Sequence, residues 1–162
     1  MKKIEEKIAH PLNPIYNSNS KILILGTMPS IKSRENKMYY SHPKNRFWIV
    51  LSSLFNEVVP STNKEKEDFL FKHNIALWDV LKSCKIKGSS DSSIKDPLVN
   101  DFNIILNKCN ITAVFTTGKK ATKLYKDLTR KDSIYLPSTS PANCSLSLEE
   151  LIKEYKIILN YL

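Results

Sequence analysis

Four short apolar segments, separated by amphipathic ones, most strongly constrain what this 162-residue chain can fold into. They lie at residues 21–25, 75–80, 111–116 and 133–136. Each is too short for a helix and lacks the polar alternation of a half-exposed strand, so each predicts a strand buried on both faces. Helical spacing predicts helices at 46–55, 64–74, 98–109, 118–128 and 147–159. This alternation predicts an α/β fold, a three-layer α/β/α sandwich around a central, mainly parallel four-stranded sheet.

Capping residues and turn formers predict where the elements and the domain begin. An Asp-Pro pair at 96–97 predicts the start of a helix, and Ser147 with Glu150 three residues later predicts a capping box. Residues 1–20 contain prolines and a run of Asn and Ser, which predict an irregular N-terminal arm. We therefore expect one domain over residues 21–162, a length typical of a single domain.

Three long polar loops follow the first, second and fourth predicted strands. They span 27–44, 81–95 and 137–144, and the first is too rich in turn-forming residues to predict a helix. Ligands bind at the carboxyl ends of the strands in parallel sheets, so we expect these loops to meet at one edge. A loop as long as 27–44 in a compact domain is usually functional or disordered, and Tyr39 and Tyr40 within it argue for order. The candidate site is therefore expected where the three loops meet.

The chain is strongly basic, with 25 Lys and Arg against 16 Asp and Glu and a formal net charge of +9. Such a surface favours a polyanionic partner, in the first place nucleic acid and less often anionic lipid. A lysine-rich proteome would produce the same excess without such a partner, and 25% charged residues is an average content.

Composition excludes several classes of protein. Three glycines cannot form a G-x-G-x-x-G or Walker loop. The three cysteines and the three histidines are widely separated, so we expect reduced thiols and no metal, cofactor or iron–sulfur site. No apolar run is long enough to span a membrane, and the acidic, proline-broken N-terminus does not resemble a secretory signal. A cytoplasmic location is the resulting expectation.

The first loop and the start of the following helix carry candidate functional residues. Tyr39 and Tyr40 are either base-stacking rings or core residues, because a flat apolar ring serves both purposes. Lys44 and Arg46 stand close to them, a pattern that suits phosphate contacts but also occurs on solvated faces. Asn45 directly precedes the helix, where its simplest role is that of an N-cap.

Five segments between residues 21 and 143 carry a resemblance to a known family. They read GTMPS, YYSHPKNRFW, LWDVLKSCKIKGSSDSSI, VFTTGKKA and LPSTSPAN. In this combination the chain is similar to the uracil-DNA glycosylase superfamily, in particular to its hypoxanthine-DNA (deoxyinosine) glycosylase branch. The second segment also resembles that of the mismatch-specific uracil and thymine DNA glycosylases. The resemblance implies the same sandwich fold and hydrolysis of the N-glycosidic bond of a flipped-out, deaminated base.

One position departs from the pattern of the superfamily. Most members carry Asp or Asn two residues after the first glycine to handle the attacking water, whereas this chain has Met28. A thioether can neither accept a proton nor orient a water. In the hypoxanthine branch the essential amide is attributed to the His-Pro-x-Asn segment, which implies a catalytic role for Asn45. Tyr40 falls where mismatch-specific relatives place the ring that stacks on the extruded base.

The resemblance also implies binding residues, several of which have simpler alternative roles. Besides Tyr40, the base would contact Gly26, Thr27, Met28, Ser89 and Asp91. The DNA backbone and groove would contact Lys44, Arg46, Lys119, Ser138, Ser140, Pro141 and Asn143. The simpler alternatives are a turn cap for Asp91, routine helix initiation at Lys119 and an ordinary Pro-Ser turn in the last loop.

The implied protein is a monofunctional, cofactor-free and monomeric DNA glycosylase acting on double-stranded DNA. Hypoxanthine is the favoured base, with uracil or a mismatched base as further substrates. Three other functions stay open: a catalytically silent relative that binds damaged DNA, a hydrolase of free nucleosides, and a purely structural module. The first is suggested by Met28, because a decayed enzyme would also lack the polar residue at this position. The net charge of +9 favours a polymeric substrate over a free nucleoside.

Overall fold

The central sheet contains four parallel strands in the order β3-β2-β6-β7. The computed structural model describes residues 3–162 and bounds these strands as β2 Ile22–Gly26, β3 Ile75–Asp79, β6 Ala113–Thr117 and β7 Ile134–Leu136. Every residue of β2 and β3 is buried, as expected for strands covered on both faces. The predicted α/β fold with a four-stranded parallel sheet is confirmed.

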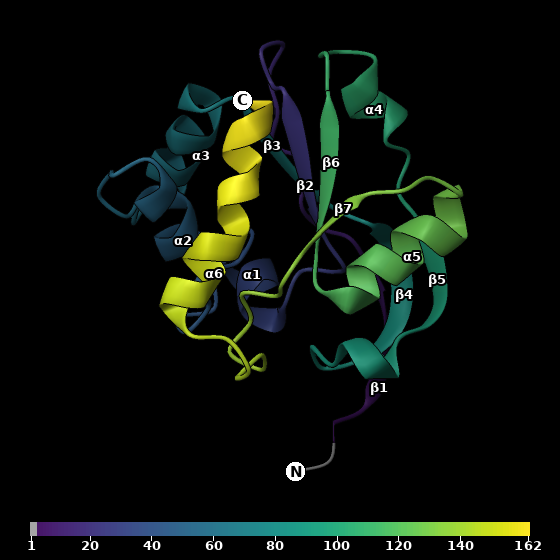
Figure 1. Ribbon diagram of the computed structural model, residues 1–162. Coiled ribbons are helices and arrows are strands. Elements are labelled where there is room, and N and C mark those ends of the chain that lie inside the picture. Colours follow the sequence, from purple (N-terminus) through teal and green to yellow (C-terminus); the bar gives the residue numbers. More distant parts are fainter. Residues whose placement is uncertain (1–2) are drawn as a thin grey trace.

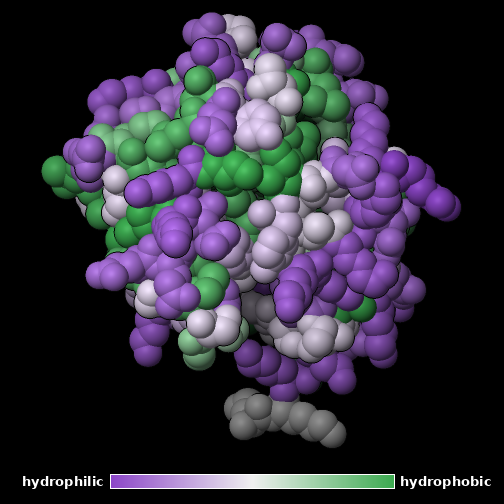
Figure 2. Space-filling model, in the orientation of Figure 1, coloured by the Kyte–Doolittle hydropathy of each residue, from purple (hydrophilic) through white to green (hydrophobic). Residues whose placement is uncertain are grey.

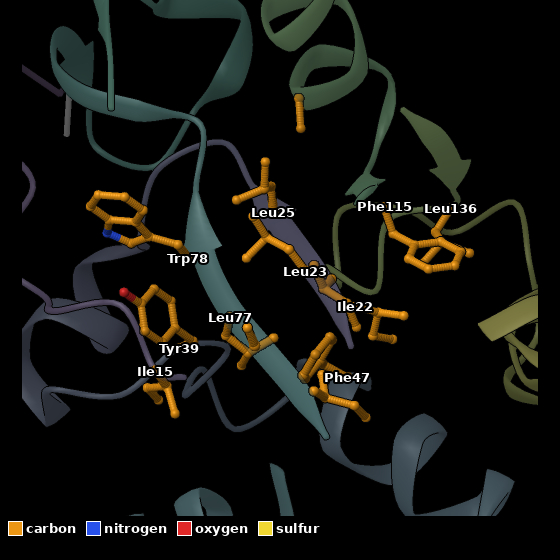
Figure 3. Close-up of a cluster of buried hydrophobic side chains, with 14 of the residues drawn as sticks. Ile15, Ile22, Leu23, Leu25, Tyr39, Phe47, Leu77, Trp78, Phe115 and Leu136 are labelled. Carbon is orange, nitrogen blue, oxygen red and sulfur yellow. The ribbon is translucent and has the colours of Figure 1, made fainter. Parts of the chain in front are cut away.

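Helices cover both faces of this sheet (Figure 1). One face carries α2 Phe47–Leu54, α3 Asn63–Lys72 and α6 Leu148–Tyr155, and the other carries α5 Lys119–Thr129. In Figure 3 Phe47 of α2 lies beside Ile22 and Leu77, and all three side chains are fully buried. Burial of one such side chain contributes about 1.5–3 kcal/mol, so this core joins helices and sheet into one unit.

The helices predicted at 46–55, 64–74 and 118–128 are observed, with ends shifted by one or two residues. The capping box of α6 is confirmed, because Ser147 Oγ accepts from Glu150 N at 3.1 Å and Glu150 Oε1 accepts from Ser147 N. A 3-10 helix, η2 Lys156–Tyr161, continues the chain directly after α6.

Hydrophilic side chains cover most of the face in Figure 2. Within residues 3–162, every helix is too short or too polar to cross a membrane.

The irregular arm predicted for residues 1–20 is wrong for part of its length. Glu5–Ala9 forms strand β1, which pairs antiparallel with β4 Leu81–Lys87. The strand pattern was hidden because this exposed edge strand carries charged residues. Ile15 exchanges two main-chain hydrogen bonds of 2.9 Å with Leu77, so the segment contacts both sheets. The first two residues of the predicted arm lie outside the described residues.

The loop predicted at 81–95 contains ordered structure instead. Strand β4 buries its apolar side chains and exposes its lysines, and it lies between β1 and β5 Lys95–Val99 in an antiparallel three-stranded sheet. A 3-10 turn, η1 Asp91–Ser93, connects β4 and β5. The prediction failed because alternation at 81–87 is broken by adjacent buried residues, Ser83 and Cys84, at a register irregularity.

The helix predicted at 98–109 is also wrong for most of its length. Pro97 lies in β5 at the edge of the antiparallel sheet, where its missing N–H leaves no ladder bond unmade. Only α4 Asn103–Leu106 is helical. The Asp-Pro pair at 96–97 thus lies within an edge strand, although the same pair often begins a helix.

A short helix also interrupts the loop predicted at 27–44. Helix α1 Ile31–Asn36 begins after Ser30, whose side chain accepts from Ser33 N, and ends at Lys37 in the left-handed conformation with φ 56°. The serine N-cap of α1 stands among turn-forming residues, which mask it in the sequence. The helix shortens the loop and directs Tyr39 and Tyr40 back towards the sheet.

Candidate active site

All four parallel strands contribute their carboxyl ends, or the residues just beyond, to one cavity of about 140 Å³. Its wall and floor include Gly26, Thr27 and Met28 after β2, Asp79 at the end of β3, Thr117 at the end of β6, and Ser138, Thr139 and Ser140 after β7. Tyr40, Asn45, Ser89 and Asp91 also line it. The expectation that three loops meet at one edge of the sheet therefore agrees with the observed geometry.

The Asn45 side chain accepts a hydrogen bond from the first residue of α2 and lines this cavity, whereas the N-cap position is Arg46, whose side chain makes no capping bond. Its Oδ1 accepts from Phe47 N at 2.9 Å and from Thr139 Oγ1 at 2.8 Å. A backbone N–H can only donate, so the bond to Phe47 identifies the oxygen of the amide and fixes its orientation. None of residues 3–162 accepts a hydrogen bond from Asn45 Nδ2. The N-cap predicted at Asn45 is thus wrong by one residue, but the bond from Phe47 N still supports the start of α2 and leaves Nδ2 for a functional role.

Tyr40 forms an aromatic wall of the cavity. Its ring stacks on Phe47 with centroids 3.8 Å apart and planes 13° apart, and its Oη lies 3.2 Å from Thr117 Oγ1. Burial raises the pKa of Tyr40 well above its ordinary value, and the nearby Asp79 carboxylate raises it further, so the phenol stays neutral. The left-handed backbone at Tyr40, φ 55°, turns the ring towards the sheet edge.

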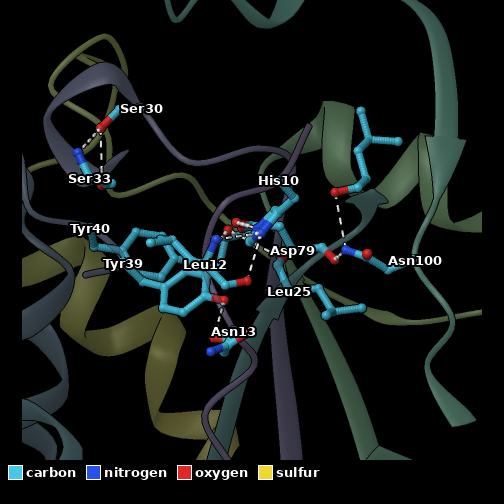
Figure 4. Close-up of polar contacts among 12 residues, drawn as sticks. His10, Leu12, Asn13, Leu25, Ser30, Ser33, Tyr39, Tyr40, Asp79 and Asn100 are labelled. Carbon is cyan, nitrogen blue, oxygen red and sulfur yellow. Dashed lines mark hydrogen bonds and ion pairs between the residues drawn. The ribbon is translucent and has the colours of Figure 1, made fainter. Parts of the chain in front are cut away.

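Asp79 and His10 form a buried polar pair beneath the cavity (Figure 4). Asp79 Oδ2 lies 2.7 Å from His10 Nε2, and the two side chains are 4% and 3% exposed. The other ring nitrogen, Nδ1, contacts the main chain of Leu12. Neither residue is among those predicted from the sequence. Asp79 was detectable as a carboxylate at the end of a predicted buried strand, whereas no pattern pointed to His10.

Because Gly26 has no side chain, three side-chain oxygen atoms can approach its backbone at the floor of the cavity. A Cβ added there would lie 2.6 Å from Asp79 Oδ1, 3.1 Å from Tyr40 Oη and 3.6 Å from Thr117 Oγ1. A contact of 2.6 Å is not tolerated, so a side chain at this position would displace Asp79. Glycine is therefore required here by close approach of neighbouring groups.

The loop after β7 is held by hydrogen bonds within itself and to α2. Arg46 Nη1 and Nη2 donate to the carbonyl oxygens of Leu146 and Asn143 at 2.7 and 2.8 Å. Asn143 Nδ2 donates to Ser138 O, and Ser138 Oγ accepts from Ser140 N. Arg46 and Asn143 thus have observed structural contacts, while their DNA contacts remain predictions.

The remaining predicted residues differ in their distance from the cavity. Ser89 Oγ accepts from Ile31 N, and Asp91 lies beside Ser89 at the cavity. Desolvation raises the pKa of the Asp91 carboxyl, Lys120 opposes the shift and Asp79 adds to it. Lys44, Lys119 and Pro141 are exposed and lie outside the cavity lining. Within the part of the chain that is described, no cluster of His, Cys, Asp and Glu is arranged to hold a metal ion.

Known proteins share both the sequence pattern and the fold of this chain. Residues 14–161 match the family model of the uracil DNA glycosylase superfamily. A hypoxanthine DNA glycosylase of Methanosarcina barkeri is 38% identical over 110 residues, which cover 67% of this chain and 70% of the relative. A hypoxanthine DNA glycosylase of Methanosarcina acetivorans is 36% identical over 134 residues, or 80% of this chain and 84% of the relative.

A solved structure shares the architecture over nearly the whole chain. The solution NMR structure of a candidate uracil DNA glycosylase from Methanosarcina acetivorans has a TM-score of 0.75 and 30% sequence identity, and the match covers 91% of this chain and 96% of that one. Since the family pattern extends over residues 14–161 and a similar fold is found in this solved structure, the chain belongs to the uracil DNA glycosylase superfamily.

Proposed function

We propose that this protein is a monofunctional DNA glycosylase that releases hypoxanthine from double-stranded DNA. The proposal is supported mainly by one observation: the Asn45 amide and the Tyr40 ring line the same cavity. The chain is also 36–38% identical to hypoxanthine DNA glycosylases. Met28 lines the same cavity and cannot perform the step assigned to a carboxylate or amide in most of the superfamily. This favours hypoxanthine over uracil as the main substrate.

The target nucleotide must leave the duplex before its glycosidic bond is accessible, which costs a few kcal/mol. Tyr40 is supported from behind by Phe47, so its ring is a rigid platform for an extruded base. Stacking of a base on an aromatic ring is worth about 1–3 kcal/mol. Tyr40 therefore offsets part of the cost of base flipping.

Asn45 acts as a hydrogen-bond donor to the leaving base. Both acceptor sites of Oδ1 are engaged by Phe47 and Thr139, whereas Nδ2 is free for the substrate. As the bond from C1′ to the base breaks, its electron pair leaves with the base, which becomes negatively charged. Water adds its oxygen to C1′, and the proton it releases neutralises the base. A donor held in place stabilises the charge on the departing base.

Contacts to the DNA strand are proposed for Lys44, Lys119, Ser138, Ser140 and Pro141. The two serines line the cavity and the other three residues are exposed. Lys44 and Lys119, together with the formal net charge of +9, would attract phosphates on either side of the flipped nucleotide, and the small serines would let main-chain N–H groups approach them. A monomer is proposed as the functional unit.

A panel of duplexes tests the proposed function. Each duplex contains one deoxyinosine, deoxyuridine, deoxyxanthosine or mismatched thymidine, and abasic sites are revealed by cleavage with alkali. We expect alkali-dependent cleavage to be fastest for deoxyinosine. Binding of the duplexes without cleavage would support a silent relative, and release of hypoxanthine from free inosine would support a nucleoside hydrolase.

A further inference from the structure

Arg46 directly follows Asn45, and its guanidinium group binds main-chain atoms of the loop at 137–146. Resting on the proposed function, we propose that Arg46 is a positioning residue, which fixes this loop in the conformation that binds the DNA strand and does not itself contact a phosphate. Tyr155 of α6 supports the same conformation at the other end of the loop. The sequence predicts a direct DNA contact for Arg46, whereas its observed contacts give it this different task.

Both terminal nitrogens of the Arg46 guanidinium are engaged within the protein. Nη1 donates to Leu146 O at 2.7 Å and Nη2 donates to Asn143 O at 2.8 Å, distances typical of charge-assisted hydrogen bonds. These carbonyl groups are 100 and 97 residues away in the sequence. The guanidinium is a planar, rigid fork, so a rotation that aims it at a phosphate would break both bonds. The geometry therefore favours the loop as the partner of this charge.

The other end of the loop is bound from α6. Tyr155 Oη donates to Pro137 O at 2.6 Å, and the Tyr155 side chain is fully buried. Burial raises the pKa of this phenol well above its ordinary value, so the hydroxyl hydrogen is present to donate. The main-chain N–H of Arg46 also donates to Thr139 O at 3.1 Å. Donors at the start of α2 and on α6 thus hold the loop at both ends, where it projects below these helices in Figure 1.

These bonds turn main-chain carbonyl groups of the loop towards the protein. Asn143 binds two more of them, because its Nδ2 donates to Ser138 O at 2.8 Å and its N–H donates to Ser140 O at 2.9 Å. Together, the bound carbonyl groups are those of residues 137, 138, 139, 140, 143 and 146. A carbonyl oxygen carries a partial negative charge and repels a phosphate, so engaging these oxygens within the protein favours the approach of DNA.

Several main-chain N–H groups of the loop are left available to a ligand. Those of Ser138, Thr139 and Cys144 donate to no atom of residues 3–162. Unpaired backbone N–H groups are donors for an anion, and phosphate oxygens are the acceptors that a DNA strand offers. Ser138 and Thr139 line the cavity, whereas Cys144 is exposed. The loop in this conformation thus presents donors both at the cavity and on its exposed part.

Two replacements of Arg46 distinguish the loop from a phosphate as its partner. Arg46→Lys keeps the positive charge but lacks the fork that binds two carbonyl groups, and Arg46→Gln loses the charge as well. If Arg46 positions the loop, both variants should bind DNA roughly tenfold more weakly or worse, the value of one hydrogen bond to a charged group. If Arg46 contacts a phosphate, Arg46→Lys should bind as tightly as the wild type and only Arg46→Gln should be impaired.

The measurement is fluorescence anisotropy of a duplex that contains one deoxyinosine, at several salt concentrations. Loss of a direct phosphate contact reduces the slope of log K against log salt concentration by about 1, because fewer counterions are released. We expect the slope to stay unchanged in both variants although the affinity falls. Arg130→Gln is the matched control, because Arg130 is exposed at the end of α5 and has no side-chain hydrogen bond or ion pair within residues 3–162. The control should alter neither affinity nor slope.

Hydrogen exchange of the free protein tests the positioning role without DNA. We expect the peptide that covers the loop at 137–146 to exchange several-fold faster in Arg46→Lys than in the wild type, because the loop opens locally. Peptides from β2 and β3 should keep their protection. A purely structural role, in which loss of Arg46 loosens the whole fold, would speed exchange in these strands as well and overturn the proposal.

Tyr155→Phe tests the other end of the loop, so that the proposal does not depend on the folding of one protein. This variant removes only the hydroxyl that binds Pro137 O and keeps the ring in the core. We expect several-fold weaker binding of the duplex, with an unchanged slope and faster exchange of the loop. An affinity equal to that of the wild type would overturn the role of Tyr155.

The outcomes separate this inference from the proposed function. A wild-type protein that neither binds nor cleaves the deoxyinosine duplex overturns both. A wild-type protein that releases hypoxanthine, with an Arg46→Lys variant that binds the duplex normally, retains the proposed function and overturns the positioning role of Arg46. An Arg46→Gln variant whose slope falls by about 1 would likewise overturn it, because that loss identifies a direct phosphate contact.

Discussion

Thr139 donates its hydroxyl hydrogen to Asn45 Oδ1 at 2.8 Å, across a sequence separation of 94 residues. This bond connects the loop after β7 to the start of α2, and Thr139 itself is 1% exposed. Together with the bond from Phe47 N, it leaves the NH2 group of Asn45 as the only part of the amide that can serve a substrate.

The Asn45→Asp variant separates the structural hydrogen bonds of Oδ1 from the donor role of Nδ2. A carboxylate oxygen accepts the same two hydrogen bonds, from Phe47 N and Thr139 Oγ1, so the free energy of unfolding should change little. It lacks the NH2 donor, so the single-turnover rate on deoxyinosine should fall about 100–1000-fold. Asn45→Ala provides the contrast, since it also removes these hydrogen bonds and should lose about 1 kcal/mol of stability. A wild-type rate in Asn45→Asp would refute the donor role.

Replacing Thr139 by Val removes the hydroxyl donor and keeps the volume of the side chain. The amide of Asn45 then loses one of two bonds that orient it, a net loss of about 0.5–1.5 kcal/mol. We expect the rate of excision to fall several-fold, measured under single-turnover conditions. Thr139→Ser retains the hydroxyl and should retain the rate; equal losses in both variants would show that packing, and not the hydrogen bond, is responsible.

Tyr40→Ala should impair excision more than it impairs folding. Loss of a stacking platform worth about 1–3 kcal/mol corresponds to a rate roughly 5–150-fold lower. Tyr40→Phe keeps the ring and should lose much less. Thermal unfolding of both variants is the necessary control, because a Tyr40→Ala protein that is destabilised yet fully active would identify Tyr40 as a core residue.

Lys44 is exposed, and we expect it to bind a phosphate of the DNA. Lys44→Ala should weaken binding to damaged and undamaged duplexes alike and reduce the slope of log K against log salt concentration by about 1. Fluorescence anisotropy at several salt concentrations measures both quantities. Lys64, on α3 and paired with Asp68, is a control position whose replacement by Ala should leave the slope unchanged.

Asp91 should make DNA binding depend on pH. Desolvation and Asp79 raise the pKa of its carboxyl, against the opposing effect of Lys120, so Asp91 is still protonated at a pH where an ordinary carboxyl is ionised. As the pH rises through this raised pKa, a negative charge forms near the phosphates and affinity should fall. Asp91→Asn should abolish that component of the pH profile, and an unchanged profile would place Asp91 away from the bound DNA.

The parallel sheet could be predicted from sequence because its strands are continuous apolar runs such as 22–25, a pattern produced by burial on both faces. The antiparallel sheet could not. Its strand β1 contains charged residues at an exposed edge, and Pro97 of β5 resembles a helix start. Local propensity was outweighed in these strands by pairing with distant segments.

Some residues of the candidate site could likewise be predicted from the sequence, and others could not. Asn45 and Tyr40 stand in a motif that can be read along the chain, and both line the observed cavity. Thr139, Asp79 and His10 belong to the same site through contacts that span many residues, 69 in the case of His10 and Asp79. A residue that acts through such a contact becomes visible only when the strands are placed side by side.

No single strand of the central sheet contains the cavity, since each of the four supplies one part of its lining. In small domains that unfold cooperatively, such parts come together only in the native state. A partly folded molecule would therefore carry the basic surface that attracts DNA without the means to cut a glycosidic bond. Release of a base would then be confined to molecules in which all four strands are in place.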